Sequence, residues 1–458
     1  MCIKIPKKII RAILILVLIM LLPCSIIYHY CRQHRSEQPV NTRVANGVLP
    51  IHFWKTTNGA AVYFVPTEHK PVVDIQVTFN AGSSRDNGKL GLSYLVSQGV
   101  IEGTNARTLG QILGCFDSTE ALYSANVDLD RAIFKLRILN DLKKLRSSVD
   151  LLAEILSTPT FPKLSIDRLK NKLLIALNVD LETEGSEYIL KSEFYKLLYN
   201  KHPYANQELG DGNLDHINVE DLINFHNTYY VANNCVITIV GNIHRDQARD
   251  LSNLITSTMK SGNSAALLPK VDQTPRELVK KVSFADANRS SVMLGQIIST
   301  SYNSDYINLI VGNAILGNSI YSRLTKNIQE KDRLAYNISS DLLTFSKPGP
   351  FFLKFYTKKE LTDKAINSVK LLLTDFINNG PTDEEVELIK HHLINSWPMQ
   401  FTTNEAILDR VSYMGFYQLP FDFFDSYIET LSSVTKGSIL KVWQQQVHPH
   451  FMATVIVG

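Results

Sequence analysis

The stretch VANNCVITIVG, residues Val231–Gly241, returns near the end of the sequence as HPHFMATVIVG, residues His448–Gly458. The two stretches align without a gap at a spacing of 217 residues, from 231 to 448. The apolar positions of the segments before them match at the same spacing, with Leu222, Ile223 and Phe225 over Ile439, Leu440 and Val442. A helix followed by a strand, repeated in register, predicts that the chain contains two copies of one folding unit.

Strand and helix patterns alternate irregularly around these repeated ends. Asn58-Gly59 lies between two apolar stretches and predicts the turn of a β-hairpin. Further patterns follow, namely a strand over 72–79, a helix over 91–100, and longer amphipathic helices over 139–156 and 165–181. Because the strands and helices do not alternate as regular βαβ units, the sequence predicts an α+β fold with two similar domains.

Changes in composition set the expected domain bounds. A polar, proline-containing stretch over 261–277 separates the two copies and predicts a linker. We expect an N-terminal domain over 48–260 and a C-terminal domain over 278–458. In front of them, residues 36–47 are typical of a tether, and residues 1–35 of a membrane anchor or signal sequence.

The net charge of +3 is unevenly distributed along the chain. Residues 1–35 hold six of the 47 basic residues and no acidic one, which leaves 41 basic against 44 acidic residues in the rest. This remainder lacks the basic excess of nucleic-acid-binding proteins, so no nucleic-acid partner is expected. With 45% hydrophobic and 20% charged residues, the chain can bury substantial cores.

The N-terminal segment has the pattern of a membrane anchor. Lys4, Lys7, Lys8 and Arg11 precede an almost unbroken apolar run over 12–27. The run is near the lower limit of about 17 residues for a spanning helix, and no small-residue cleavage site follows it. We favour an uncleaved, single-pass anchor in a bacterial inner membrane, with the body in the periplasm. The alternative is a cleaved signal peptide, which would release the protein into the periplasm.

Only two of the five cysteines, Cys115 and Cys235, lie outside this segment. They do not have the spacing of metal ligands. A disulfide between them stays open as an alternative, and two buried thiols are the favoured interpretation.

Three segments after the anchor are informative together. They are AGSSRDNGKLGLSYLVSQGVIEGT over 81–104, His202-Pro203-Tyr204 with the stretch that follows it to 241, and NAILGNSIYSRLTKNIQEKDRLAYNISS over 313–340. These segments resemble the pitrilysin/insulinase family of zinc peptidases. Their order and spacing agree with the duplicated layout. The resemblance implies two homologous domains, each a mixed, largely antiparallel sheet packed with helices.

The chemistry of that family requires the inverted motif His-x-x-Glu-His on one helix and a further Glu from a later helix. In the matching helix, Tyr94, Ser97 and Gln98 stand at the positions of His, Glu and His. These side chains are poor zinc ligands, and the stretch Lys172–Asn178 has no acid where the last ligand is expected. The resemblance therefore implies a degenerate site with no zinc cofactor and no catalytic residue.

Other candidate sites have plainer explanations. Glu387 and His391 have the spacing of helical metal ligands, but Thr382–Glu385 is a capping box that opens an amphipathic helix. We therefore interpret the pair as part of a solvated helix face. His202 and His226 are interpreted as structural. The chain has no HExxH motif, Cys-rich cluster or Gly-x-Ser-x-Gly elbow.

The second half keeps part of the family's substrate-binding pattern. Active relatives place an Arg seven residues before a Tyr, and both contact the bound peptide. Here Tyr336 matches the Tyr, while Gln329 stands at the Arg position. Arg333 is expected on the same helix, one turn from Gln329, where it could supply the missing charge. Gly317 belongs to the matching Gly-rich turn. The alternative is that Tyr336 only packs within its own domain.

Three functions are compatible with these features. We favour a non-catalytic, peptide-binding subunit that pairs with a zinc-bearing homologous peptidase chain and holds unfolded peptide as an added strand. The main alternative is a membrane-bound scaffold or assembly protein with no proteolytic role, which the missing Arg favours. The third is an active zinc endopeptidase, and the residues at 94, 97 and 98 argue against it. The chain is therefore not expected to be an enzyme by itself.

Overall fold

The computed structural model describes residues 44–46, 48–68, 70–206, 214–274, 276–284, 288–299 and 304–458. The expected membrane segment, residues 1–35, lies outside these ranges. In the described part of the chain, no helix is both long enough and apolar enough to cross a membrane. The short strand β1 (Val44–Asn46) falls inside the stretch 36–47 that the sequence assigns to a tether. The domain bounds as a whole stay a prediction.

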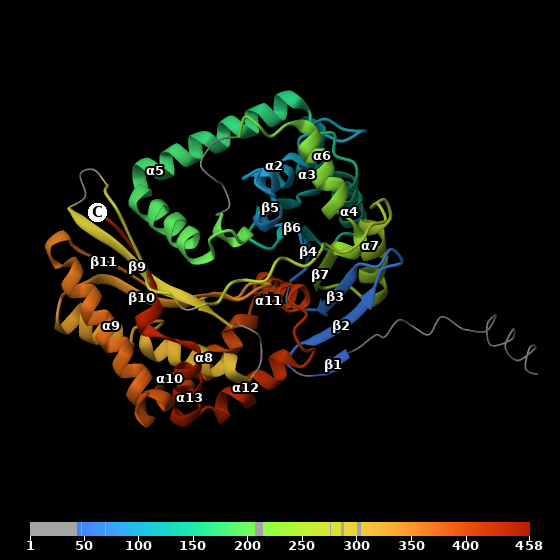
Figure 1. Ribbon diagram of the computed structural model, residues 1–458. Coiled ribbons are helices and arrows are strands. Elements are labelled where there is room, and N and C mark those ends of the chain that lie inside the picture. The colour runs from blue at the N-terminus through green and yellow to red at the C-terminus, as the bar shows by residue number, and fades with distance from the viewer. Residues whose placement is uncertain are drawn as a thin grey trace, which may run out of the picture. The chain divides into compact units, whose positions relative to one another are not determined.

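Within the described residues, the strands form a seven-stranded sheet and a five-stranded sheet (Figure 1). The strands of the first sheet are β1, β2 (Pro50–Lys55), β3 (Ala61–Pro66), β4 (Val72–Phe79), β5 (Leu122–Val127), β6 (Ala132–Leu139) and β7 (Cys235–Gly241). The strands of the second sheet are β8 (Leu278–Val282), β9 (Arg289–Ile298), β10 (Tyr336–Leu342), β11 (Gly349–Lys358) and β12 (Ala453–Val457).

The two sheets share one strand order. The first contains β3-β7-β4-β6-β5 after the extra strands β1 and β2, and the second reads β8-β12-β9-β11-β10. In each series the first pair is parallel and every other pair is antiparallel. This arrangement confirms the expected α+β fold with two mixed, largely antiparallel sheets.

Helices surround both sheets. Those of the first half are α2 (Leu92–Gly99), α3 (Leu109–Thr119), α4 (Leu142–Ser157), α5 (Lys163–Tyr199), α6 (Val219–Tyr229) and α7 (Arg245–Thr256). Those of the second half are α8 (Ser304–Leu316), α9 (Thr362–Asn379), α10 (Asp383–Ser396), α11 (Asn404–Phe416), α12 (Phe423–Ser433) and α13 (Lys436–Gln446).

The repeated ends of the two halves agree residue by residue. Helices α6 and α13 begin at 219 and 436 and end at 229 and 446, which is the spacing found in the sequence. Both helices open with a capping box that satisfies free N–H groups of the first turn. Leu222 and Ile439, which match in the repeat, are both fully buried. The duplication thus extends from the sequence to the caps and the packing.

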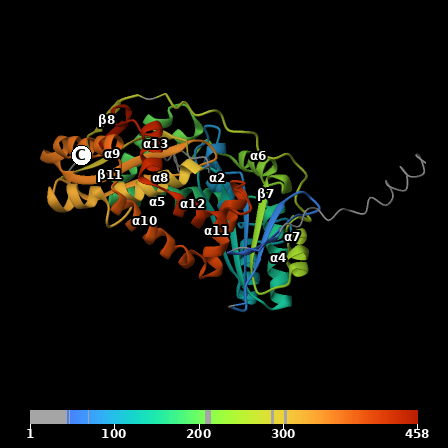
Figure 2. The same ribbon diagram turned by 90° about the horizontal axis from the view of Figure 1, so that it is seen from below.

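Each sheet is covered on one face by a helix from the other half. Helix α5 packs on β8, β9 and β12, and helix α11 packs on β3, β4 and β7 (Figures 1 and 2). The contact between α5 and the second sheet is apolar and includes Phe194, Met293, Phe352 and Val455. The remaining helices of each half cover the other face, where the main cores lie.

Strand β4 shows how a helix from the other half changes the burial of a strand. The sequence predicts a strand with alternating sides, yet Asp74, Gln76 and Thr78 are as buried as the apolar residues between them. Helix α11 covers this polar side, and Gln76 Nε2 donates hydrogen bonds to Thr78 Oγ1 and Ser412 Oγ. A buried polar face is stable only when its groups find such partners.

Several local predictions are confirmed and one is corrected. The hairpin turn is present at Gly59, which has a φ of +99° in the left-handed region. The helix expected over 139–156 instead begins after Asp141, whose carboxylate accepts from Lys144 N at 2.9 Å. Residue 139 is the last residue of β6, so the apolar pattern that predicted the helix began inside a strand. Cys115 and Cys235 are free thiols, the first half-buried and the second buried.

A buried polar network ties the two halves together around Asp130, which is 1% exposed. Tyr204 donates its hydroxyl hydrogen to Asp130 Oδ1 at 2.6 Å. Asp130 Oδ2 accepts from Ser346 N at 2.7 Å and from the Tyr417 hydroxyl at 3.2 Å. Burial raises the pKa of Asp130, although the bonds from Tyr204 and Ser346 act in the opposite direction. Ser346 and Tyr417 belong to the second half, so the network is a junction between the halves.

Candidate functional site

Helix α2 begins at a left-handed glycine and a buried aspartate. Gly91, the residue before the helix, has a φ of +91°, which would strain a residue with a side chain. Asp86 accepts from Gly91 N at 2.9 Å and from Ser93 N at 2.8 Å, so it satisfies free donors of the first turn. Burial raises the pKa of Asp86 to about 7, although these hydrogen bonds act in the opposite direction. These contacts fix where the helix starts and how its residues are oriented.

Tyr94, Ser97 and Gln98 all lie on α2, but their surroundings differ. Tyr94 and Gln98, one turn apart, are half-buried, and burial raises the pKa of the Tyr94 phenol. Ser97 is fully buried, and its Oγ has no hydrogen-bond partner among the described residues. Gln98 Nε2 donates to the carbonyl oxygen of Ala125 at 3.2 Å. A phenol, a buried hydroxyl and an amide that is already bonded do not fit a zinc ion.

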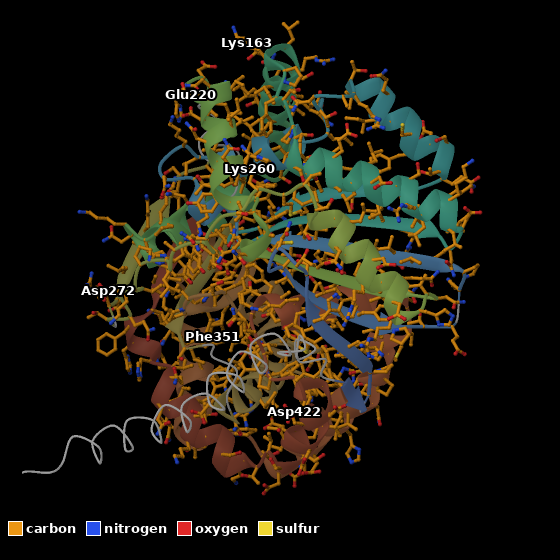
Figure 3. The ribbon with its side chains drawn as sticks, turned by 90° about the vertical axis from the view of Figure 1, so that its right-hand side faces the viewer. Lys163, Glu220, Lys260, Asp272, Phe351 and Asp422 are labelled. Atoms are coloured by element: carbon orange, nitrogen blue, oxygen red, sulfur yellow. The ribbon has the colours of Figure 1, made fainter. Side chains whose placement is uncertain are left out.

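Helix α5, which contains the stretch where a further ligand was expected, packs against α2. Figure 3 labels Lys163 at the start of α5 and Glu220 on α6, and both helices pack on α2. Leu173 and Leu177 are the buried residues of the stretch 172–178. Among the described residues, no group of three His, Cys, Asp or Glu side chains could hold a metal ion. The expectation that the protein has no zinc cofactor stays a prediction.

Strand β5 lies beside α2 and is an edge strand of the first sheet. It pairs with β6 in a continuous register from Leu122 opposite Arg137 to Val127 opposite Ala132. The strand has no charged residue, no proline and no bulge, which are the usual protections of an exposed edge. Leu122 is 68% exposed. Such an edge can pair with an extended peptide through main-chain hydrogen bonds.

The predicted residues of the second half gather around β10, an edge strand of the second sheet. Tyr336 begins this strand, is 39% exposed, and stacks on Tyr356 with ring centroids 5.9 Å apart. Gln329 Oε1 accepts from Ile338 N at 3.5 Å. Gly317 lies so close to the strand that a Cβ there would be 2.5 Å from Ser340 Oγ. The structure therefore brings Tyr336, Gln329 and Gly317 to one strand.

The expected position of Arg333 on the helix of Gln329 is wrong. The π-helical segment η4 (Thr325–Lys331) contains Gln329 but ends before Arg333, which has a φ of +53°. The chain turns there, because Leu334 N bonds back to Ile328 O at 3.0 Å and leads directly into β10. Arg333 is exposed and is not one helical turn from Gln329. The argument that it replaces the missing charge by helical spacing therefore fails.

Sequence reasoning missed the charged residues that surround Tyr356. The Tyr356 hydroxyl donates to Glu187 on α5, and Lys354 forms an ion pair with the same carboxylate. The Arg289 guanidinium lies 4.8 Å from the centroid of the Tyr356 ring. These residues come from three distant segments, and only the alternation of Lys354 and Tyr356 on one strand face was visible in the sequence.

The two groups of predicted residues remain separate. Among the described residues, no hydrogen bond, ion pair or ring contact joins the α2 positions to the residues around β10. The α2 positions lie beside the first sheet, and Tyr336 lies on the second sheet. A ligand that touches both groups would have to span the halves or belong to an assembly of chains.

Comparisons with known proteins agree with this layout. Residues 62–212 match a family model described as insulinase (peptidase family M16), and residues 216–393 match one described as peptidase M16 inactive domain. A Helicobacter pylori protein named non-peptidase homolog YmxG is 26% identical over 378 residues, which are 81% of this chain and 85% of that protein. A Rickettsia felis protein named as an uncharacterized zinc protease is 24% identical over 415 residues, or 88% of this chain and 96% of that protein.

Solved structures show the same fold. The peptidase M16 inactive domain from Pseudomonas fluorescens has a TM-score of 0.84 at 27% identity, and the match covers 90% of this chain and 98% of that one. The periplasmic protease PqqL from Escherichia coli has a TM-score of 0.76 at 15% identity, which shows a shared fold alone. That match covers 91% of this chain but 48% of PqqL. The two family models describe successive domains of one family and together match 62–393, so the chain belongs to peptidase family M16, the insulinase family.

Proposed function

We propose that this chain is a non-catalytic, peptide-binding subunit that works with a zinc-bearing homologous peptidase chain. The observation that carries the proposal is the junction of α2 and β5. Gln98 keeps the helix bonded to the edge strand at Ala125, while neutral side chains occupy the positions that match the family's zinc ligands. An edge strand held beside a helix that lacks the groups to polarise a water molecule supports peptide binding without catalysis.

The proposed ligand is an unfolded polypeptide that adds a strand to β5. An edge strand without charges, prolines or bulges is a liability for aggregation unless it serves for pairing. Main-chain pairing gives affinity for many sequences, which suits a subunit that presents varied peptides to a catalytic partner. Tyr336, exposed on the second half, would contact peptide held in the assembly with the partner chain.

The proposed location is the periplasmic face of a bacterial inner membrane. The basic start and apolar run of residues 1–35 support an anchor that leaves the body outside the cytoplasm. The E. coli relative of the same fold is named a periplasmic protease, which is consistent with this location. Cleavage of the segment would leave the protein in the same compartment.

A membrane-bound scaffold is the second candidate. The observation that favours it is Gln329, which stands where active relatives have an Arg and is bonded inside its own domain to Ile338 N. A scaffold would have no use for a substrate-binding cation. An active zinc endopeptidase is the third candidate, and the surroundings of Ser97 and Gln98 oppose it.

The test is reconstitution of the full-length chain, in mild detergent, with a zinc-bearing M16 chain from the same organism. We expect the two to co-purify and the pair to cleave an unfolded peptide faster than the zinc-bearing chain alone, with loss of activity on chelation. This chain alone should contain no stoichiometric zinc and cleave nothing. Co-purification without any change in cleavage would favour the scaffold, and chelator-sensitive cleavage by this chain alone would refute both non-catalytic proposals.

A further inference from the structure

A chamber of about 960 Å³ lies between the two halves. On one side its wall includes residues of β4, β5 and β6 and Arg131 just before β6, and on the other residues of α8, α11, the end of β10 and the β10–β11 connection. Its volume is near the upper end of the range of about 300–1,000 Å³ for ligand sites in proteins. The chamber contains none of the positions that the family resemblance singled out.

Helix α11 presents one face to this chamber. Ala406, Asp409, Arg410 and Tyr413 line it, with the spacing of residues that share one side of a helix. Residues on the other side of the helix pack against the first sheet, Val411 among them. The orientation of the lining residues is therefore fixed by the buried contacts of the same helix.

The charged side chains of the lining are mostly cations. Arg131 forms an ion pair with Asp128 at 2.7 Å, and Lys135 forms one with Asp409 at 2.6 Å. Arg410 is exposed and has no ion pair with any described residue. Its planar guanidinium can donate two parallel hydrogen bonds to a carboxylate. Arg410 is thus the group in the lining with the most capacity to bind an anion.

Edge strand β5 borders the same chamber. Ser124 and Asn126 line it, and both side chains are exposed. A peptide added along β5 would extend the sheet, so every second side chain would lie on the face that Ser124 and Asn126 occupy. Those side chains would enter the chamber that Arg410 lines.

We propose that the chamber receives acidic side chains of an extended peptide paired with β5, and that Arg410 binds one of their carboxylates. The inference rests on the peptide-binding role proposed above and adds the class of peptide, which has Asp or Glu at alternate positions. Cations make up three of the four charged side chains in the lining, Arg131, Lys135 and Arg410 against Asp409. This charge favours carboxylates over ammonium groups.

The test measures binding of two labelled hexapeptides to the full-length chain in mild detergent. One alternates Val with Glu and the other Val with Lys, and fluorescence anisotropy reports the affinity. We expect the Glu peptide to bind at least about tenfold more tightly than the Lys peptide, and Arg410→Gln to remove most of this preference. Arg146→Gln, which changes an exposed arginine on α4, should leave it unchanged.

Charge reversal separates a specific contact from a general effect of charge. Arg410→Glu should favour the Lys peptide, whereas Arg410→Lys should keep part of the preference for Glu. Equal binding of both peptides by the unaltered chain, or a preference that survives Arg410→Gln, would overturn the inference. If the zinc-bearing chain is still activated in that case, the proposed function stands without this inference. Intact Glu selectivity without any activation of the zinc-bearing chain would mean that the inference about acidic peptides stands and the proposed function fails.

Discussion

Gln98 on helix α2 donates a hydrogen bond of 3.2 Å to the main-chain oxygen of Ala125 on the edge strand β5. Tyr94 lies one turn earlier on the same helix, and both side chains are half-buried. Solvent and small ions can therefore reach this face of the helix. Two histidines at i and i+4 on such a face form a metal-binding pair.

Changing both residues to histidine should create a zinc-binding pair on α2. We expect Tyr94→His with Gln98→His to bind zinc at least about tenfold more tightly than the unaltered chain, because imidazole nitrogens replace a phenol and an amide. Isothermal titration calorimetry with zinc measures the difference. Tyr94→Asn with Gln98→Asn is the matched control and should gain nothing. One zinc bound per unaltered chain would mean that the proposed ligand positions are misplaced.

Tyr336→Phe should leave the fold intact and affect only a reaction in which the hydroxyl takes part. The Tyr336 ring stacks on Tyr356, and its hydroxyl has no hydrogen-bond partner among the described residues. The free energy of unfolding should change by less than about 0.5 kcal/mol. In the reconstituted pair, we expect slower peptide cleavage. An unchanged rate would remove Tyr336 from the substrate site and favour the scaffold.

Gly312→Ala should destabilise the second half through a steric clash. A Cβ at Gly312 on α8 would lie 2.1 Å from Nε1 of Trp443, which is fully buried on α13. We expect a loss of about 1–3 kcal/mol in the free energy of unfolding, because a packed indole cannot move aside without strain. Gly114→Ala is the control, since Gly114 lies on α3 with no atom within 4 Å of a new Cβ. It should gain roughly 0.5–1 kcal/mol, as alanine is the better helix former.

His226 should make the protein less stable in mild acid. Its Nε2 lies 2.9 Å from Leu156 O, and burial lowers its pKa from 6.5 to about 4. Between these values the unfolded chain binds a proton that the folded chain does not, so stability falls as the pH falls from 6.5 to 4. A fall from pH 7 to pH 5 should therefore lower the free energy of unfolding by about 2 kcal/mol through His226.

Urea unfolding of the natural chain and of His226→Gln at both pH values isolates this effect. Glutamine can also donate to the Leu156 oxygen but does not titrate. The variant should therefore lose about 2 kcal/mol less than the natural chain on acidification. Parallel losses in both proteins would assign the acid sensitivity to other groups.

Elements specified by neighbouring residues could be predicted from the sequence. The hairpin turn at Asn58-Gly59 and the two terminal strands follow from glycine geometry and apolar alternation over a few positions. The repeat at 217 residues, from 231 to 448, correctly indicated equivalent helices and strands in both halves. Tyr94, Ser97 and Gln98 were placed on one helix for the same reason.

Contacts between distant segments could not be predicted. Gln76 and Ser412 are 336 positions apart, and nothing near Gln76 indicates that a helix of the other half covers it. The burial of Ser97 and the neighbourhood of Tyr356 depend likewise on segments far along the chain. Arg333 was misplaced because a helical pattern does not show where the chain turns. The chamber lined by Arg410 also arises only when the halves meet.

Tyr204→Phe should weaken the junction between the halves more than Tyr417→Phe does. The Tyr204 hydroxyl bonds to Asp130 at 2.6 Å and the Tyr417 hydroxyl at 3.2 Å. Removing the first leaves a fully buried carboxylate with fewer donors and should cost about 1–3 kcal/mol, whereas the second should cost about 0.5–1.5 kcal/mol. Fewer donors raise the pKa of Asp130 further, so the penalty in Tyr204→Phe should grow as the pH rises from 5 to 8. Urea unfolding at both pH values measures it, and equal costs in the two variants would show that Asp130 does not depend on the shorter bond.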